Sequence, residues 1–269
     1  MSYATLMVYV EEESGHIRLA ATLAERLQAR LIGVAACPPM PVVTGEDAPI
    51  DSILFAQEEV AMRASLDKTG EQFRSIVGDG TVAVDWRSAP DFPSKFVIRE
   101  ARAADLVIVG QTSTRPHHAL DVGALLLRVG RPVLVVPTAV VSLGPRRAVV
   151  AWKDTREARR VLCDALPMLQ LAENIFLVEI CEWGAEDQAQ QRLSDVSSFL
   201  AHHGITNVTE RILQHPAIAG EVLVRFAQDV QADLIVAGAY GHSRLGEWMF
   251  GGVTRELLTR SPVCCLFSH

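Results

Sequence analysis

Residues 229–238 read DVQADLIVAG, and residues 101–110 read ARAADLVIVG. Each segment is an apolar run that follows an Ala-Asp pair and ends in glycine, which is typical of a buried parallel strand. Roughly twenty residues further on, a proline opens a second apolar run in both places, at Pro132 and at Pro262. Because the two matches lie about 130 residues apart, the chain is predicted to contain two copies of one folding unit.

The beginnings of the two copies also correspond. Residues 6–10 lead through a polar turn into a helical stretch at 17–27, and residues 148–152 lead in the same way into one at 157–169. The segment from Ala139 to Pro145 joins the copies. We therefore expect two domains, at residues 1–138 and 146–269.

Within each copy, short apolar runs alternate with stretches of helical period, which is typical of βαβ crossovers in a parallel sheet covered on both faces. In the second copy, strands are predicted at 147–152, 174–180, 207–213, 233–237 and 263–267, and helices at 156–169, 186–203, 218–231 and 252–260. The predicted fold class is α/β, with two tandem flavodoxin- or Rossmann-like domains that each contain a five-stranded, parallel, doubly wound sheet. In such a sheet, ligands bind beyond the strand ends where the winding reverses, here between the first and fourth strands.

The charge of the chain opposes some functions. A formal net charge of -7 and a pI near 5.6 disfavour a general nucleic-acid binder, because affinity for phosphates needs clustered Lys and Arg. No apolar stretch approaches the roughly 20 residues of a membrane-spanning helix. The first residues lack the basic segment of a signal peptide. We therefore expect a cytoplasmic protein that binds neither nucleic acid nor membrane.

The residues that carry metal or catalytic chemistry do not form a known motif. The five cysteines show no CxxC spacing, so buried structural thiols are predicted rather than disulfides or a zinc site. The pairs His117-His118 and His202-His203 are neighbours in sequence, which favours solvated side chains over a metal site. The motifs GxxxxGK(S/T), HExxH and GxSxG are absent, as is GxGxxG after the first strand. We assign no catalytic residue and no metal ligand.

A glycine-rich loop follows the predicted fourth strand of the second copy. It runs from Gly238 to Thr254, directly before a helix, and its other glycines are Gly241, Gly246, Gly251 and Gly252. Glycine lets the backbone approach an anion, and the unpaired N–H groups at a helix start favour phosphate. Arg244 would add a charged fork, and Thr254 a hydroxyl donor. Without a ligand, the same glycines would only shape a surface loop.

With this loop the sequence resembles the universal stress protein family. The pattern is Gly-x2-Gly-x9-Gly, followed closely by Ser or Thr, after a strand of the type ADLIV-G; Gly238, Gly241 and Gly251 fit its spacing. The resemblance covers essentially the whole chain, as a tandem member with an adenine nucleotide alpha hydrolase-like fold. It implies that ATP or a related adenine nucleotide, with or without Mg²⁺, binds in the second copy. The adenine would lie near the ends of the first and second strands, and the loop would wrap the phosphates.

The resemblance implicates a set of binding residues at these strand ends and in the loop, to which we add His242 and Arg244 from their place in the loop. The implicated residues are Ala151, Trp152, Lys153, Ile180, Ala237, Gly238, Gly241, Gly251, Gly252, Val253 and Thr254.

Two positions depart from the family pattern. The usual acidic residue at the end of the first strand is Lys153 here, which removes an acceptor from the adenine or ribose side. Lys153 is either a phosphate or ribose contact or an ordinary exposed lysine. The Ser or Thr directly after the third glycine is Gly252, and its missing hydroxyl can be offset by Thr254. Trp152 either flanks a base or packs in the core.

The first copy has lost the loop. It keeps only Gly110 in register, carries Pro116, and places Asp121 opposite Gly251. A carboxylate at this helix start would repel phosphate and would serve well as a helix cap. We therefore expect the first copy to be empty of triphosphate, with the insertion Pro38 to Ile50 able to cover or replace its site.

Together these features predict a stress-response protein that binds an adenine nucleotide in its C-terminal domain and acts as a sensor or regulator. The alternatives are a structural or interaction module of the same fold and a weak ATPase in which His242 assists hydrolysis. The last strands, 132–136 and 263–267, are apolar edges that are expected to pair. Their pairing would make an intramolecular pseudo-dimer, with a homodimer as a further assembly.

Overall fold

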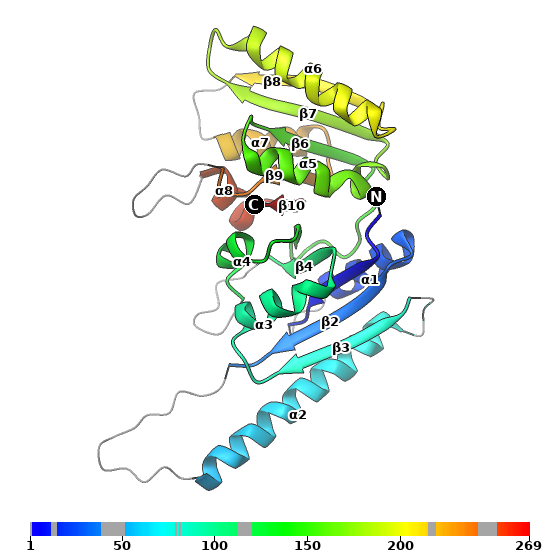
Figure 1. Ribbon diagram of the computed structural model, residues 1–269, viewed down its shortest axis with the longest axis vertical. Coiled ribbons are helices and arrows are strands. Elements are labelled where there is room, and N and C mark those ends of the chain that lie inside the picture. Colours follow the sequence, from blue (N-terminus) through cyan, green and yellow to red (C-terminus); the bar gives the residue numbers. More distant parts are fainter. Residues whose placement is uncertain are drawn as a thin grey trace, which may run out of the picture.

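Strands and helices alternate along both halves of the chain in the computed structural model (Figure 1). The structure describes residues 2–11, 15–38, 52–78, 80, 82–111, 120–214, 219–241 and 252–269, without the side chains of 52–56. The first half contains β1 (Thr5–Tyr9), α1 (Gly15–Leu27), β2 (Arg30–Ala36), α2 (Ser52–Val77), β3 (Val84–Ala89), α3 (Pro93–Glu100), the short 3-10 helix Ala101–Ala103, β4 (Leu106–Gly110), α4 (Val122–Arg128) and β5 (Val133–Val136). The second half contains β6 (Arg147–Trp152), α5 (Arg156–Leu169), β7 (Asn174–Cys181), α6 (Glu186–His202), β8 (Val208–Gln214), α7 (Ala219–Asp229), β9 (Leu234–Gly238), α8 (Gly252–Arg260) and β10 (Cys264–Ser268).

All these strands form one sheet, with the order β3-β2-β1-β4-β5-β10-β9-β6-β7-β8. Within each half the neighbours are parallel, and the order is third, second, first, fourth, fifth. The α/β class and the reversal between first and fourth strands are as predicted. This order is that of the first five Rossmann strands and differs from the flavodoxin order, in which the third strand lies beside the first.

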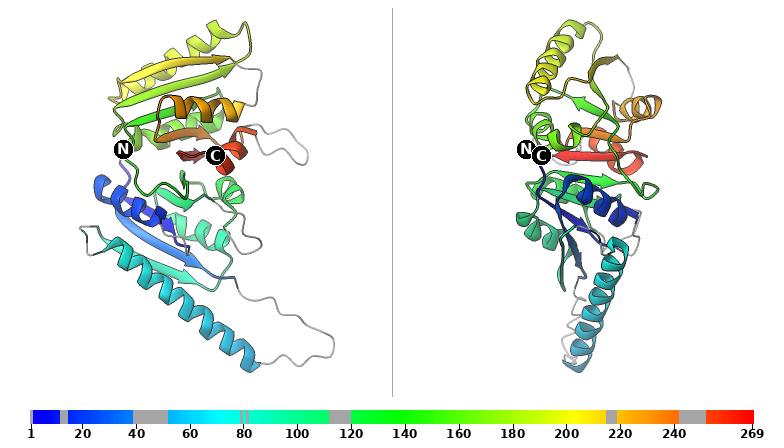
Figure 2. Two further views of the ribbon diagram at one scale, coloured as in Figure 1. Left: turned by 180° about the vertical axis from the view of Figure 1, so that it is seen from behind. Right: turned by 90° about the vertical axis from the view of Figure 1, so that its right-hand side faces the viewer.

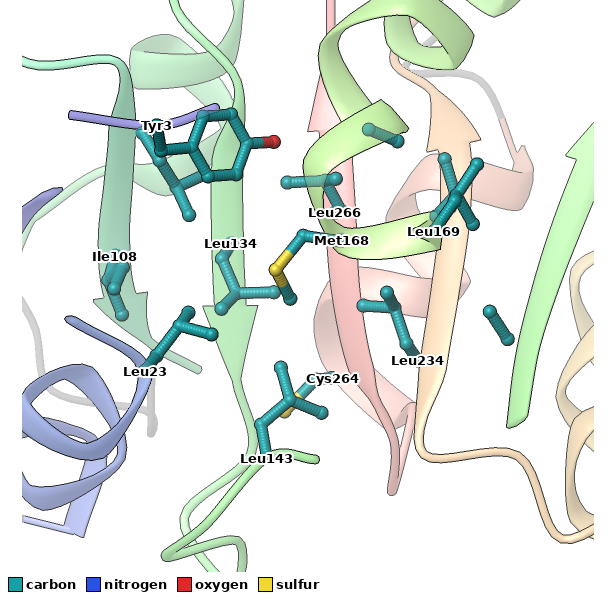
Figure 3. Close-up of a cluster of buried hydrophobic side chains, with 14 of the residues drawn as sticks. Tyr3, Leu23, Ile108, Leu134, Leu143, Met168, Leu169, Leu234, Cys264 and Leu266 are labelled. Atoms are coloured by element: carbon teal, nitrogen blue, oxygen red, sulfur yellow. The ribbon is translucent and has the colours of Figure 1, made fainter. Parts of the chain in front are cut away.

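The two halves meet at a seam between β5 and β10, which pair antiparallel through Cys265 with Val135 and Leu266 with Leu134. The predicted pairing of the last strands is therefore confirmed, and neither strand leaves an open edge at the seam. Hydrogen bonds add to the seam: Gln111 Nε2 donates to the carbonyl oxygen of Ser261 at 3.2 Å, and the Tyr3 hydroxyl donates to that of Asp164. Figure 3 shows Leu134 and Leu266 side by side there.

Apolar side chains cover both faces of the sheet because successive strand residues point to opposite sides. One core runs unbroken across the seam beneath α1 and α5 and contains Leu6, Leu134 and Leu266. The other lies beneath α3, α4, α7 and α8 and contains Met7, Val135 and Cys265. Both cores continue across the seam and so fix the halves against each other. Figure 2 shows the two halves side by side along the sheet.

Most predicted boundaries in the second half lie within one or two residues of the observed ones. The helix predicted at 218–231 is shorter, because the chain turns through a left-handed backbone at Gln231, with φ of 53°. The prediction of buried thiols is right for Cys264 and Cys265 but wrong for Cys163, which is exposed. Residue 163 lies on the outer face of α5, while the neighbouring Leu162 and Leu166 point inward.

The longest helix, α2, extends beyond the sheet at its beginning (Figure 1). Its 26 residues span about 39 Å at roughly 1.5 Å per residue, whereas the neighbouring strand β2 has 7 residues. Among the described residues, no helix is both long and apolar enough to cross a membrane.

Candidate functional site

The candidate site lies where β6 and β9 end side by side. These strands pair in parallel up to Ala151 and Ala237, so Trp152 and Gly238 emerge at the same edge of the sheet. The helix α5 begins directly above this edge, after Thr155, whose hydroxyl oxygen accepts from the backbone N–H of Ala158 at 3.3 Å. The predicted reversal point is therefore the place where the loop, the first strand and a helix start come together.

Gly238 and Gly241 pack closely against the first turn of α5. A Cβ atom on Gly238 would lie 2.7 Å from the backbone nitrogen of Ala158, closer than real side chains come. A Cβ atom on Gly241 would lie 3.0 Å from Thr155 Oγ1 and 3.1 Å from Glu157 Oε2. Glycine is needed at Gly238, and is favoured at Gly241, for the contact with α5, whether or not a ligand binds.

Glu157 brings a buried carboxylate to this edge, and the sequence reasoning missed it. The residue is 7% exposed, and its Oε1 accepts from Arg156 Nε at 3.1 Å, although the Arg156 side chain is itself 74% exposed. Burial of a carboxylate is costly unless partners compensate for the lost water. The signal that could have found Glu157 is its place in the first helical turn after the first strand, close to the point where the winding of the sheet reverses.

The turn after β9 is held from α8. The Tyr240 backbone is left-handed, with φ of 56°, and its N–H donates to Thr254 Oγ1 at 3.2 Å. Thr254 is only 3% exposed. The structure thus gives this hydroxyl a role in fixing the turn, and its contact with phosphate stays a prediction.

Tyr240 also reaches the other half of the chain. A Cβ atom on Gly123, in the first turn of α4, would lie 3.0 Å from the Tyr240 hydroxyl. Burial raises the pKa of Tyr240, and the nearby Asp121 carboxylate raises it further. The loop of the second half therefore touches the corresponding helix start of the first half across the seam.

The residues expected on the adenine side surround the ends of β6 and β7. Ala151 and Ile180 are half-buried and Lys153 is exposed. Trp152 is 8% exposed, and its buried Nε1 has no hydrogen-bond partner among the described residues. Trp183, just beyond β7, is 77% exposed and was missed by the sequence reasoning. The signal that could have found Trp183 is its position in the sequence, just after the second strand of this half, where the base is expected to lie.

Part of the predicted phosphate loop lies outside the described residues. His242, Arg244 and Gly251 belong to that part. Ala237 is buried near the end of β9, Val253 is half-buried in α8, and Gly252 is exposed where α8 starts. The structure thus brings together the strand ends, the first two glycines and the helix start.

The corresponding helix start in the first half is closed by its own side chain. The Asp121 carboxylate accepts from the backbone N–H of Ala124 at 2.9 Å, which confirms the predicted helix cap. The helix α4 has 7 residues and α8 has 9, and neither has an acidic residue in its first turn, so the carboxylate that differs is the one before α4, Asp121. At the end of β4, a Cβ atom on Gly110 would meet His16 Nδ1 at 3.2 Å, so His16 occupies the place that Glu157 has in the second half.

Comparison with known proteins gives a consistent result for the second half. Residues 146–268 match the sequence model of the Universal stress protein family. A curated universal stress protein from Synechocystis is 22% identical over 165 residues, a match that spans 59% of this chain and 56% of that protein's length.

Solved structures resemble the whole chain. A universal stress protein from Archaeoglobus fulgidus superposes with a TM-score of 0.74 at 13% identity, covering 98% of both chains. A functionally unknown protein from Pseudomonas aeruginosa gives 0.64 at 15% identity, covering 99% of this chain and 92% of that one. At such identities the likeness concerns the fold, and it includes the arrangement of the two halves.

Proposed function

Because the chain belongs to the universal stress protein family through residues 146–268, we propose that its second half binds an adenine nucleotide, with ATP, alone or with Mg²⁺, as the first candidate. The domains are 1–138 and 146–269, which form an intramolecular pseudo-dimer across the seam. The bound nucleotide makes the protein a sensor or regulator in a cytoplasmic stress response. The proposal is assembled from a phosphate side at α8 and an adenine side at β6 and β7.

The observation that carries the proposal is the open start of α8. Gly252 begins this helix and is exposed, and no atom of the residues that the structure describes lies within 4 Å of the position where a Cβ would stand. Backbone N–H groups at such a start are unpaired, and the helix dipole favours an anion there. The start also lies after β9, beside the end of β6, where doubly wound sheets bind ligands.

The adenine side is supported by the residues at the ends of β6 and β7. The half-buried Ala151 and Ile180 offer apolar contacts for a base, and the exposed Trp183 offers a ring on which it can stack. Lys153 stands at the end of β6 where the family pattern has an acid, but Glu157 supplies a carboxylate to the same edge. An acceptor for hydroxyl or amino groups is therefore still present there.

A specific observation also favours the second candidate, an interaction module without nucleotide. The close contacts of Gly238 and Gly241 with α5 explain both glycines by packing alone. In that case the loop only turns the chain, and the function would rest on protein contacts. The two candidates differ in whether an anion occupies the start of α8.

Calorimetry with ATP on the full chain, beside Gly252→Asp and Gly252→Ala, tests the proposal. We expect about one site per chain and at least a tenfold loss of affinity in the Asp variant, because a like charge would face the phosphate. Gly252→Ala is the matched control, since the added methyl group meets no described residue within 4 Å. Asp at a helix start is not destabilising, so the midpoint temperature of thermal unfolding should not be lower in the Asp variant.

Two results would contradict the proposal: no heat of binding in the parent protein, or equal affinity in all three proteins. Mass spectrometry of small molecules released from the denatured protein identifies any nucleotide that co-purifies. A hydrolysis assay on the same samples separates a nucleotide sensor from a weak ATPase.

A further inference from the structure

The chain that follows β9 is in contact with both halves of the molecule at Tyr240. On one side, the backbone N–H of Tyr240 donates to Thr254 Oγ1 in α8 at 3.2 Å. On the other side, the Tyr240 hydroxyl lies 3.0 Å from the position that a Cβ atom on Gly123 would take in the first turn of α4. The helices α4 and α8 lie on the same face of the sheet, on either side of the seam (Figure 1, Figure 2). Tyr240 therefore links the beginning of the glycine-rich loop to a helix of each half.

The backbone of Tyr240 depends on such contacts. Its φ of 56° lies in the left-handed region, which is uncommon for a residue with a side chain. A backbone of this kind persists only where the surrounding structure holds it. Tyr240 directly precedes Gly241, so its conformation sets the direction in which the chain enters the rest of the loop.

The glycine at position 123 makes room for the Tyr240 hydroxyl. The described atoms within 4 Å of a Cβ atom there are this hydroxyl, at 3.0 Å, and Asp121 Oδ1, at 3.3 Å. Because burial and the nearby Asp121 carboxylate raise the pKa of Tyr240, the hydroxyl is uncharged at neutral pH. Glycine is a poor helix former. The contact with Tyr240 thus gives a reason for this glycine that α4 alone does not.

We propose that Tyr240 is a positioning residue through which the first half of the chain holds the nucleotide loop of the second half in its binding conformation. This inference rests on the proposed function. The first half then supports binding through Tyr240 rather than by touching the nucleotide. Because coupling between two sites is reciprocal, nucleotide bound in the second half in turn restrains the start of α4.

Moving a small group from one side of the seam to the other tests the coupling. Gly123→Ala adds a methyl group beside Tyr240, and Tyr240→Phe removes the hydroxyl that this methyl group would meet. We expect each single variant to weaken ATP binding about three- to fivefold in calorimetry, within the usual range for residues in contact. The double variant should bind within about twofold of the parent protein, because the methyl group of one half takes the place of the hydroxyl of the other.

Gly15→Ala is the matched control for the change in the first half. It makes the same substitution in the first turn of α1, where the nearest described atoms are the Thr138 carbonyl oxygen at 3.5 Å and Val141 Cγ1 at 3.7 Å. Neither residue belongs to the second half, so the affinity for ATP should not change. Thermal unfolding checks that each variant is folded.

A second measurement follows α4 itself. Hydrogen exchange of the α4 backbone amides, with and without saturating ATP, reports whether the nucleotide restrains this helix. We expect ATP to slow this exchange in the parent protein and to have a smaller effect in Gly123→Ala and in Tyr240→Phe. A residue that only stabilises the loop would not make a helix of the other half respond to nucleotide.

Three results overturn the proposal in a protein that binds ATP: single variants that bind as tightly as the parent protein, a double variant whose loss is the product of the two single losses, or slower exchange in the second half alone. Each of them leaves the proposed nucleotide binding standing. If the parent protein binds no ATP, the proposed function fails, and the coupling that rests on it fails as well.

Discussion

The two halves of this chain share one fold but treat the helix start after their fourth strand in opposite ways. In the first half, Asp121 closes the start of α4 by accepting from the backbone N–H of Ala124. In the second half, α8 starts at the exposed Gly252, with no acid in its first turn. A single carboxylate thus distinguishes a helix start that is capped by its own side chain from one where the sequence has Gly251, which has no side chain, at the corresponding position. The scaffold does not set this difference, since both starts follow a parallel strand in the same order.

A second difference lies at the contact between the first helix of each half and the end of its fourth strand. A Cβ atom on Gly238 would meet the backbone of α5 beside the buried Glu157, whereas the described atoms nearest to a Cβ on Gly110 belong to the His16 ring. Backbone cannot move aside as a side chain can. Equivalent glycines therefore differ in how strictly they are required, and substitution can measure the difference.

The largest effect is expected from Gly238→Ala compared with Gly110→Ala. The added methyl group meets backbone atoms at 2.7 and 2.8 Å in the second half but side-chain atoms at 3.2 Å or more in the first. We expect a loss of about 2–3 kcal/mol in the free energy of unfolding for Gly238→Ala and under about 1 kcal/mol for Gly110→Ala. Urea denaturation of both variants measures this. Equal losses would show that α5 is not packed more tightly than α1.

The next effect concerns nucleotide affinity. Gly251 lies outside the described residues, and Asp121 aligns with it in the first half, so Gly251→Asp gives the second half the residue that closes the first. We expect at least a tenfold loss of affinity for ATP, about 1.4 kcal/mol, with little change in stability. Calorimetry gives the affinity, and thermal unfolding is the control. Unchanged affinity would place Gly251 away from the phosphate, and two sites per parent chain would contradict an empty first half.

The sequence was sufficient to predict the fold class and the edge of the sheet at which the candidate site lies. The reversal between the first and fourth strands and the pairing of the last strands were predicted correctly, because apolar runs and the Pro132 and Pro262 matches are local features. Glu157, Trp183 and the contact of Tyr240 with α4 were not predicted. The burial of a side chain and its contacts across the seam depend on how the helices pack on the sheet. The spacing of residues within one segment does not reveal this packing.

The exposed Cys163 illustrates the same limit. Cysteine is among the most buried residue types, so composition favours burial, but one step along a helix turns a side chain by about 100°. Leu162 points into the core and Cys163 points out.

Removing either of two helix caps should cost less stability, and about the same amount in each half. The Asp121 side chain accepts from Ala124 in α4, and the Thr155 side chain accepts from Ala158 in α5, so each half has one cap near its site. We expect Asp121→Ala and Thr155→Ala each to cost about 1 kcal/mol of stability. Hydrogen exchange of the first-turn amides locates each loss. Nucleotide affinity should stay unchanged in Asp121→Ala, and a gain of a second binding site would mean that Asp121 alone keeps phosphate out.

The smallest effect is expected in the pH dependence of stability. It concerns His16, the buried side chain beside Gly110, whose place Glu157 takes beside Gly238. Burial lowers the pKa of His16 from its ordinary value of 6.5, while the hydrogen bond between its Nε2 and the Tyr9 carbonyl, 2.7 Å long, partly opposes the shift. The folded protein therefore holds His16 neutral, and the unfolded chain binds the proton more readily. His16 contributes its full stability above about pH 6.5, and that contribution falls as the pH drops through 6.5 towards the folded pKa. Urea denaturation at pH 7.5 and pH 5.5 should show a smaller difference in His16→Gln than in the parent protein, because the remaining histidines titrate in both. If the two proteins lose stability equally, His16 is not held neutral at the end of β4, and the contrast with the second half reduces to the helix starts alone.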